Sequence, residues 1–265
     1  MAKVRADVLL FEKGLVESRE KGKRVIMEGT VYVGTVRIDK PGEQLDEDTP
    51  IYIKKNPLKY VSRGGFKLER AAQVFRLDLK SCVCMDMGAS TGGFTDFMLK
   101  EGAKKVYAVD VGYGQLDWSI RSDSRVEVLE RTNIRYMEED SIPEKLDFVS
   151  IDVSFISLKH IFPVAAKLLK DTGSVVALVK PQFEAGRDKV GKKGIVRDMM
   201  VHKEVLENVM AMAVENGLYP CGLTFSPITG TTGNIEFLLY MTKREGTVDQ
   251  LTINSVLRES HSILG

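Results

Sequence analysis

CVCMDMGASTGGF, residues 82–94, is an apolar run that ends in a turn of small residues. The apolar run predicts a buried strand, and the small residues predict a tight turn into a helix that begins near Gly93. A strand, a glycine turn and a helix are the first parts of an α/β sheet, in which ligands bind at the carboxyl ends of the strands. We therefore expect a ligand at this turn, although a purely structural tight turn is the alternative.

Further apolar runs follow this stretch, with helical segments between them, at residues 105–112, 125–130, 147–155 and 174–183. This alternation predicts a doubly wound, mostly parallel sheet. A long helix over about 198–216 then leads into LYPCGLTFS and IEFLLYM, which only a loop separates. The last strand is therefore expected to be antiparallel, which completes a seven-stranded, Rossmann-like α/β fold.

The residues before this sheet predict a separate α+β module. Two helices are expected, from Arg5 to Glu12 and from Ser18 to Glu28, with a break at Gly14 and a stop at Gly29. Short strands are expected in VYVG, TVRI and IYIKK, at residues 31–34, 35–38 and 51–55, and the stretch between the last two is rich in turn residues.

The predicted domains are therefore a small α+β domain over residues 1–58, a linker over 59–65, and the α/β domain over 66–265. Within the last, a helix is expected from about Phe66 to Phe75. The tail after residue 241 is expected to end in a further helix.

The composition indicates a globular protein. Of the residues 43% are hydrophobic and 28% are charged, and the formal net charge is +1. The chain shows no export signal and no apolar run of the roughly 18 to 20 residues that a membrane helix needs, so we expect a cytoplasmic protein. Its three cysteines fit no disulfide or zinc spacing and are expected to be buried thiols, and its three histidines lie far apart, so no metal site is expected.

The spacing of the glycines bears on the ligand. A strand, turn and helix of this kind could bind NAD, FAD or S-adenosylmethionine. Glycines at 88, 92 and 93 do not form the G-x-G-x-x-G cradle of the dinucleotide cofactors. S-adenosylmethionine, which has no phosphate, fits better, with Asp110 on its ribose and Asn133 beside its adenine, although a loop Asn is often only a turn former. The cofactor-binding candidates are Asp86, Gly88, Ala89, Ser90, Thr91, Gly92, Gly93, Phe94, Asp110, Asn133 and Asp152.

Four charged residues are the catalytic candidates: Lys67, Asp152, Lys180 and Glu236. Asp152 and Lys180 follow two apolar strands and Glu236 opens a third, so we expect all three at the carboxyl edge of the sheet, where the cofactor lies. A lysine at the end of an apolar strand is costly to bury unless carboxylates accompany it. A structural ion pair is the alternative.

These motifs resemble known families. RADVLLFEKGLVESREKGKRVIMEGTVYVGTVRIDKPGEQL resembles the S4 RNA-binding domain along its length, and DMGASTGGFTD with the four charged residues resembles the FtsJ-type 2′-O-ribose methyltransferases. Together they resemble the TlyA family, whose members are often labelled haemolysins, over nearly the whole chain up to about Met241. The resemblance implies a class I methyltransferase fold and methylation of ribosomal RNA at a cytidine ribose 2′-hydroxyl.

The resemblance also suggests roles for individual residues. Lys180 is expected to act on the 2′-hydroxyl, with Lys67 as its neighbour and with Asp152 and Glu236 setting its orientation. The IDVSF motif favours ribose over a base nitrogen, because amino-group methyltransferases commonly have Asn or Asp followed by two prolines and an aromatic residue.

Basic residues outside these motifs are the RNA-binding candidates. The segment 186–193 is a near miss of a P-loop, since Lys replaces the Ser or Thr that would hold magnesium. We interpret it as a basic loop over the RNA entrance, with an ordinary solvated loop as the equal alternative. The full set is Arg5, Arg19, Lys23, Arg24, Arg63, Arg187, Lys189, Lys192 and Lys193.

Other functions remain as alternatives at this point. One is a non-catalytic RNA-binding or ribosome-assembly factor, which the complete set of four charged residues disfavours. Another is a membrane-acting haemolysin, which the absence of long apolar segments disfavours. The sequence is compatible with a monomer or a homodimer.

Overall fold

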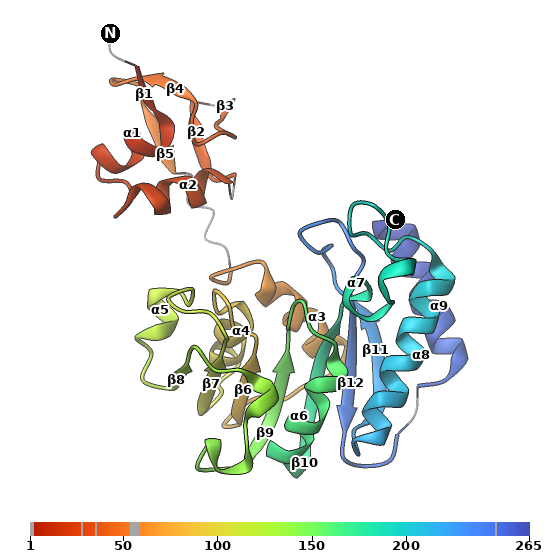
Figure 1. The fold of residues 1–265 in the computed structure, drawn as a ribbon. Coiled ribbons are helices and arrows are strands. Elements are labelled where there is room, and N and C mark those ends of the chain that lie inside the picture. The colour runs from red at the N-terminus through yellow and green to blue at the C-terminus, as the bar shows by residue number, and fades with distance from the viewer. Residues whose placement is uncertain (1–2, 28, 35, 54–58, 247) are drawn as a thin grey trace. The chain divides into compact units, whose positions relative to one another are not determined.

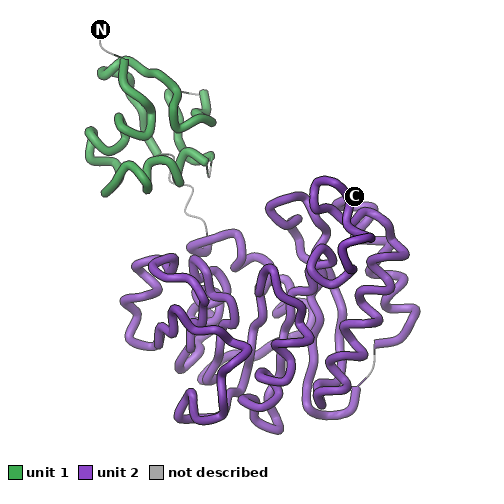
Figure 2. The backbone as a smooth tube through the Cα atoms, viewed as in Figure 1, with its two compact units in different colours: residues 1–58 green, residues 59–265 purple. Residues whose placement is uncertain are grey.

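The computed structural model describes residues 1–265 except 1–2, 28, 35, 54–58 and 247. The chain forms two compact units, Met1–Leu58 and Lys59–Gly265, which Figure 2 shows in different colours.

The small unit contains two helices and two small sheets. Its elements are β1 (Lys3–Arg5), α1 (Ala6–Glu12), α2 (Arg19–Met27), β2 (Val31–Val33), β3 (Val36–Arg37), β4 (Gln44–Asp46) and β5 (Ile51–Ile53). β1 pairs with β4, and β2 lies between β3 and β5, all antiparallel. A core that includes Leu9, Leu10 and Ile26 joins the helices to the strands. Two helices packed on short antiparallel strands agree with the α+β prediction.

Two strands of the small unit were not expected. β1 and β4 pair through Lys3–Asp46, Val4–Leu45 and Arg5–Gln44, and β4 lies inside the stretch that we expected to be rich in turns. Three residues are too few for a period-2 pattern, so this pairing depends on contacts between distant segments. Residues 28, 35 and 54–55 of the expected elements lie outside the described residues.

The large unit is an α/β domain with a central sheet (Figure 1). Its strands are β6 (Val83–Met87), β7 (Lys105–Val109), β8 (Val126–Leu129), β9 (Leu146–Ile151), β10 (Leu169–Val179), β11 (Tyr219–Phe225) and β12 (Phe237–Thr242). Its α-helices are α3 (Gly64–Phe75), α4 (Gly93–Lys100), α5 (Trp118–Arg121), α6 (Phe162–Leu168), α7 (Pro181–Glu184), α8 (Met199–Glu215) and α9 (Gln250–Leu264).

The sheet has the order β11-β12-β10-β9-β6-β7-β8. The pairs among β6 to β10 are parallel, whereas β12 is antiparallel to both β10 and β11. The predicted seven-stranded, mostly parallel sheet with a final antiparallel strand is confirmed. The chain runs from β6 outward to β7 and β8 and then returns to β9 on the other side of β6. This reversal places a crevice between the carboxyl ends of β6 and β9, where such sheets bind ligands.

Helices cover both faces of the sheet. One core cluster packs Met85 and Val149 against residues of α6, α8 and α9, including Phe162 and Leu206. The other packs neighbouring strand residues such as Cys84 against α3, α4 and α5. Successive strand residues point to opposite faces, so both sets of side chains are buried, as in doubly wound folds.

Some boundaries differ from the expectations. α3 begins at Gly64, so part of the expected linker is helical, and β10 begins at Leu169, with a register irregularity against β9 before Ser174. Cys221 is exposed rather than buried, because β11 is an edge strand. The C-terminal helix is confirmed as α9.

The described residues contain no helix with the length and apolar character needed to cross a membrane.

Tight packing at the start of the large unit leads to a first prediction. A Cβ added at Gly65 would lie 2.3 Å from Cγ of Tyr60, whose ring is 1% exposed and packs against Phe66 and Phe97. Gly65→Ala is therefore expected to lower the free energy of unfolding of this unit by about 2 kcal/mol, a typical cost of overpacking. Thermal melting measures the change.

Gln73→Ala on the exposed side of the same helix is the matched control and should stay within about 0.5 kcal/mol of the wild type. Equal melting of the two variants would contradict the packing argument.

Candidate active site

A cavity of about 300 Å³ lies where the carboxyl ends of β6 and β9 meet. Its walls come from the end of the linker, the start of α3, the glycine turn, Asp152 and a loop before β12. The lining residues are Ser62, Arg63, Gly64, Lys67, Asp86, Gly88, Ala89, Ser90, Thr91, Gly93, Phe94, Asp152, Ile228, Thr229, Gly230 and Thr231. The cavity therefore gathers most of the candidate cofactor and catalytic residues from segments that are far apart in the sequence.

The glycine turn brings two strands unusually close together. Gly88 has a φ of +92°, and a Cβ at this position would lie 2.4 Å from the backbone oxygen of Asp152. The N–H of Asp152 donates to the carbonyl of Met87 at 2.9 Å, so the chain of β9 stays beside β6 as both leave the sheet. Gly93 is equally crowded, since its Cβ would lie 2.3 Å from Oγ of Ser62. Only glycine meets these requirements.

The carboxylate of Asp86 is directed into the protein. One oxygen accepts hydrogen bonds from the backbone N–H and the hydroxyl of Thr95, at 2.9 and 2.7 Å, and the other accepts from Oγ of Ser150 at 3.2 Å. Burial raises the pKa of Asp86 to about 7, although these hydrogen bonds oppose the shift. Asp86 therefore ties the start of α4 to β6 and β9 while it lines the cavity floor.

Asp110 and Asn133 lie outside the lining of the cavity. Asp110 follows β7, and its carboxylate accepts from the N–H of Ser90 at 2.8 Å and from that of Gly112 at 2.7 Å. It therefore stands beside the glycine turn, and its contact with the cofactor ribose stays a prediction. Asn133 caps a short 3₁₀ turn by accepting from the N–H of Arg135 at 3.2 Å, and it lines a separate open pocket. Asn133 thus forms a turn, and its contact with adenine stays a prediction.

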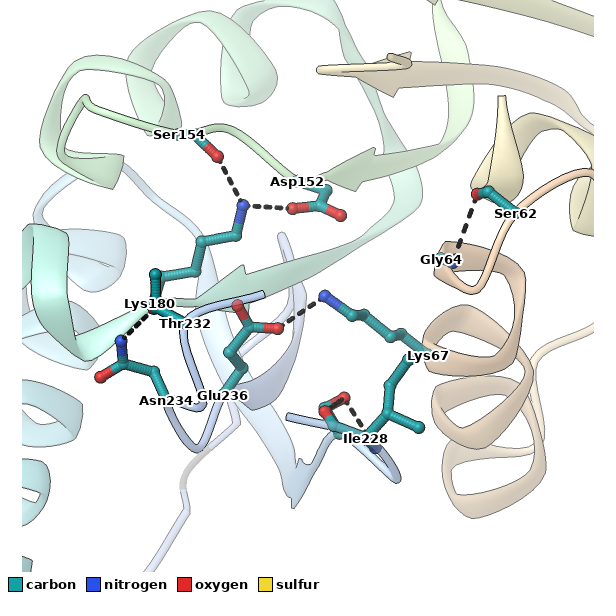
Figure 3. A network of polar contacts seen from close by, with 11 residues as sticks. Ser62, Gly64, Lys67, Asp152, Ser154, Lys180, Ile228, Thr232, Asn234 and Glu236 are labelled. Carbon is teal, nitrogen blue, oxygen red and sulfur yellow. Dashed lines mark hydrogen bonds and ion pairs between the residues drawn. The ribbon is translucent and has the colours of Figure 1, made fainter. Parts of the chain in front are cut away.

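The four catalytic candidates form two ion pairs, which Figure 3 shows side by side. Nζ of Lys180 lies 2.6 Å from Oδ1 of Asp152, and Nζ of Lys67 lies 2.6 Å from Oε2 of Glu236. Lys67, Lys180 and Glu236 are each at most 9% exposed. A buried ion whose partner is removed typically costs 3–5 kcal/mol, so each lysine depends on its carboxylate.

The pairing differs in one respect from the expectation. Glu236 bonds to Lys67, whereas the second partner of Lys180 is Ser154, which accepts a hydrogen bond from Nζ at 2.9 Å. Ser154 was not among the residues selected from the sequence, although the place of this serine in IDVSF, two residues after Asp152, was an available signal.

The loop before β12 was also missed. Ile228–Thr231 line the cavity, and the N–H of Gly230 donates to the carbonyl of Asn234 at 2.9 Å to close the turn. Gly230 and Gly233 in TGTTGN could have indicated such a turn. The hydroxyl of Ser62, at the end of the linker, is a further residue that the sequence analysis did not select.

The basic candidates fall into different surroundings. Arg63 is exposed and lines the cavity, and Arg187, Lys192 and Lys193 are exposed on the loop after α7. Lys189 forms an ion pair with Glu204.

In the small unit the side chain of Arg5 bonds to Asp7, at 3.0 Å for both nitrogens, so its charge is compensated locally. Arg19, Lys23 and Arg24 are exposed on α2. Among the described residues, no group of three or more His, Cys, Asp or Glu side chains is arranged to hold a metal ion.

The buried carboxyl of Asp86 leads to a pH prediction. Its folded pKa of about 7 exceeds the ordinary value of about 3.9, so ionisation opposes folding, and stability falls as the pH rises from about 4 to about 7. Asn does not titrate, and its amide oxygen can still accept from Thr95. Asp86→Asn should therefore gain stability over the wild type with rising pH, on the order of a few kcal/mol by pH 7, with no further change above it.

Thermal melting of the large unit from pH 4 to pH 8 measures this difference. Gln73→Ala, at an exposed position and without any change in a titratable group, is the control and should show a flat difference. A flat difference for Asp86→Asn as well would refute the raised pKa.

Comparisons with known proteins agree with this geometry. The model of the FtsJ-like methyltransferase family matches residues 60–243, and that of the S4 domain matches residues 4–51. YqxC of Bacillus subtilis is 52% identical over 99% of this chain and 95% of its own length. A Mycobacterium tuberculosis protein named 16S/23S rRNA (cytidine-2′-O)-methyltransferase TlyA is 38% identical over 90% of both chains.

A solved structure from Streptococcus thermophilus covers 99% of this chain and 97% of its own, at 50% identity and a TM-score of 0.79. The match of the family model to more than half of the chain, over the segments that build the sheet and the cavity, shows that this chain belongs to the FtsJ-like methyltransferase family and carries an S4 domain at its N-terminus.

Proposed function

We propose that this protein transfers a methyl group from S-adenosylmethionine to a ribose 2′-hydroxyl of ribosomal RNA, with cytidine as the nucleotide. The observation that carries the proposal is the Lys180–Asp152 pair beside the cavity, at the edge of the sheet where the glycine turn lies. Membership of the FtsJ-like methyltransferase family supports S-adenosylmethionine as the cofactor. The name of the M. tuberculosis relative supports ribosomal RNA as the substrate and the 2′-oxygen of cytidine as the methylated position. A ribosomal substrate also supports a cytoplasmic location.

The residues of the cavity fit the cofactor. Its methionine end carries an amino and a carboxylate group, and the lining offers charges of both signs: Arg63 and Lys67 as cations, and Asp152 as an anion. The close approach at Gly88 leaves the turn's backbone as one wall of the cavity. Asp110, one hydrogen bond from Ser90 of this lining, is placed to accept from the ribose hydroxyls of the cofactor.

The cofactor supplies a methyl group that is already activated, so the protein must mainly align the acceptor and help to remove its proton. Lys180 has three N–H donors, of which Asp152 and Ser154 engage two. The third can donate to the substrate 2′-oxygen, which directs a lone pair of that oxygen toward the methyl group and stabilises the oxygen while its proton passes to the carboxylate of Asp152, the proton acceptor of the pair. Alignment of this kind can account for several kcal/mol of the barrier, on the order of 7 or more in well-oriented cases.

The second ion pair has a positioning role in this proposal. Lys67 lines the cavity, and Glu236 engages one of its three donors, so the remaining donors can hold the sugar or its phosphate. Both pairs are largely shielded from water, which strengthens their interaction with a charge that develops on the 2′-oxygen.

An exposed aromatic side chain lies next to the catalytic pair. Phe155 is 91% exposed, has a φ of +64°, and follows Ser154 directly. Its ring centroid lies 5.1 Å from that of Phe183. A bulky residue in the left-handed region costs of order 1–3 kcal/mol, and such strain often accompanies function. We propose that Phe155 stacks on a base of the RNA substrate, as aromatic residues do in proteins that bind unpaired nucleotides.

Basic residues extend this surface. Arg63 at the cavity and Arg187, Lys192 and Lys193 on the loop after α7 are proposed to contact phosphates. In the small unit, Arg19, Lys23 and Arg24 lie on α2, where Arg19 and Lys23 are one helical turn apart. We propose that this helix contacts structured RNA through its backbone, with Arg5 as a weaker contributor because of Asp7.

The proposed function is tested by transfer of labelled methyl groups from S-adenosylmethionine to purified small and large ribosomal subunits, followed by mapping of the 2′-O position. Lys180→Ala should lower kcat at least about 100-fold, because it removes the group that acts on the hydroxyl, while cofactor binding stays within a few-fold. Lys80→Ala, an exposed lysine before β6, is the control and should be unaffected.

Label on a base rather than on ribose would contradict the chemistry proposed here. Full activity of Lys180→Ala would contradict the role of this lysine. Cofactor binding without label on either subunit would favour the non-catalytic RNA-binding factor.

Phe155→Ala should raise the KM for RNA about tenfold, because stacking on one base contributes about 1–3 kcal/mol, while the Kd for the cofactor is unchanged. Phe155→Tyr keeps the aromatic face and should retain most of the affinity. If Phe155→Ala and Phe155→Tyr have the same KM as the wild type, the aromatic ring does not contact the substrate.

A further inference from the structure

The C-terminal helix α9 is tied to the large unit by more than apolar packing. Ile253, Val256 and Leu257 are buried in the core, and the helix packs against α8 and β11. In the last turn of α9, His261 contacts His202 of α8. The side chain of His202 is completely buried. Nδ1 of His202 lies 2.9 Å from Nε2 of His261. One hydrogen bond therefore joins the rings of two residues that are 59 positions apart in the chain.

The direction of this hydrogen bond follows from a backbone carbonyl. Nε2 of His202 lies 3.2 Å from the carbonyl oxygen of Val196, which can only accept. Nε2 must therefore carry the proton, so Nδ1 is the acceptor and Nε2–H of His261 is the donor. The ring of His202 also meets that of Phe237 edge-on, with centroids 5.4 Å apart. Phe237 directly follows Glu236 in the chain.

The chain of hydrogen bonds continues from Val196 to the loop that lines the cavity. The N–H of Val196 donates to Oδ1 of Asn234 at 2.9 Å, and Nδ2 of Asn234 donates to the carbonyl of Gly194 at 2.8 Å and to Oγ1 of Thr232 at 3.0 Å. Asn234 is fully buried, and Figure 3 shows it beside Thr232 and Glu236. Its own carbonyl closes the turn from Gly230. One side chain thus holds segment 194–196 against the loop that lines the cavity.

We propose that α9 positions this loop and Glu236 through the hydrogen bonds that run from His261 to Asn234. His261, His202 and Asn234 are positioning residues: none of them lines the cavity, but they fix the wall and the carboxylate that holds Lys67. This role goes beyond the proposed function and rests on it, because the Lys67–Glu236 pair is assigned there to the substrate.

The physical reason lies in the tautomer of His202. Without a donor at Nδ1, that nitrogen is a buried, unsatisfied acceptor. Moving the proton to Nδ1 would not help, because it would leave an unsatisfied donor there and turn a lone pair of Nε2 toward the carbonyl of Val196. The ring can satisfy Nδ1 only by turning away from that carbonyl toward another donor. Loss of the His261 donor therefore releases segment 194–196 and weakens the hold of Asn234 on the loop.

The test compares two substitutions at one position in the full-length protein. His261→Leu fills the space between α8 and α9 but removes the donor, whereas His261→Gln keeps an N–H that can reach His202. We expect His261→Leu to lower kcat for methyl transfer to ribosomal subunits about tenfold, with the KM for RNA and the Kd for the cofactor within about twofold, since small misplacements of catalytic groups mainly slow the reaction. His261→Gln should recover most of kcat.

Ser262→Ala, at an exposed position in the same turn, is the matched control and should equal the wild type. Nitrogen NMR of the imidazole of His202 gives a readout that does not depend on activity. The carbonyl of Val196 should keep the proton on Nε2 wherever the ring stays in place. The wild type and His261→Gln should show Nδ1 with the nitrogen shift of a hydrogen-bonded acceptor, whereas His261→Leu should show the shift of an unbonded Nδ1 and faster exchange of the Nε2 proton.

Wild-type kcat in His261→Leu, with or without a lower melting temperature, would overturn the proposal and leave α9 as a packing element only. An equal loss of kcat in His261→Gln and His261→Leu would also overturn it. If His261→Leu does not fold, an unbonded Nδ1 together with full kcat in His261→Gln overturns it, and a hydrogen-bonded Nδ1 with full kcat supports it. If wild-type protein transfers no methyl group, the proposed function fails, whereas the nitrogen shift of Nδ1 still tests the hydrogen bonds.

Discussion

The close contact between Gly88 and the backbone of Asp152 is the constraint on which the rest of the site depends. A Cβ at Gly88 would lie 2.4 Å from the oxygen of Asp152, so the chains that leave β6 and β9 can touch only because residue 88 is glycine. This contact brings the glycine turn and the carboxylate of Asp152 to one cavity. The strand order, which reverses at β6, supplies the crevice that the contact narrows.

One electrostatic reason explains why both lysines of the site, Lys67 and Lys180, can be buried. Each is almost fully buried and each meets one carboxylate, so no unpaired charge is left in a region of low dielectric constant. The partners come from different parts of the chain: Lys67 and Glu236 are 169 residues apart. The core of the sheet holds these segments together, so the burial of apolar side chains on both faces is what makes the ion pairs possible.

Backbone strain is also found on the same side of the sheet, where three of the five described non-glycine residues with positive φ lie, whereas Arg76 and Ser81 lie elsewhere. Ser90, Arg131 and Phe155 have positive φ angles and follow β6, β8 and β9, respectively. Non-glycine residues in this region each cost free energy, which the surrounding hydrogen bonds and packing must offset. The N–H of Ser90 donates a compensating hydrogen bond to the carboxylate of Asp110, and Phe155 packs against Phe183. The edge that we assign to catalysis is thus also the edge where the fold tolerates unfavourable backbone geometry.

Local patterns in the sequence predicted the sheet, its final antiparallel strand and the residue types at its carboxyl edge, because apolar runs and glycines act over a few neighbouring residues. Asp86, Asp152 and Lys180 could therefore be selected from their places at strand ends. The folded chain was needed to see that Glu236 bonds to Lys67, that Ser154 is the second partner of Lys180, that Asn133 caps a turn, and that β1 pairs with β4. Which side chains meet across tens to hundreds of residues is set by the packing of the whole core, which no local pattern records.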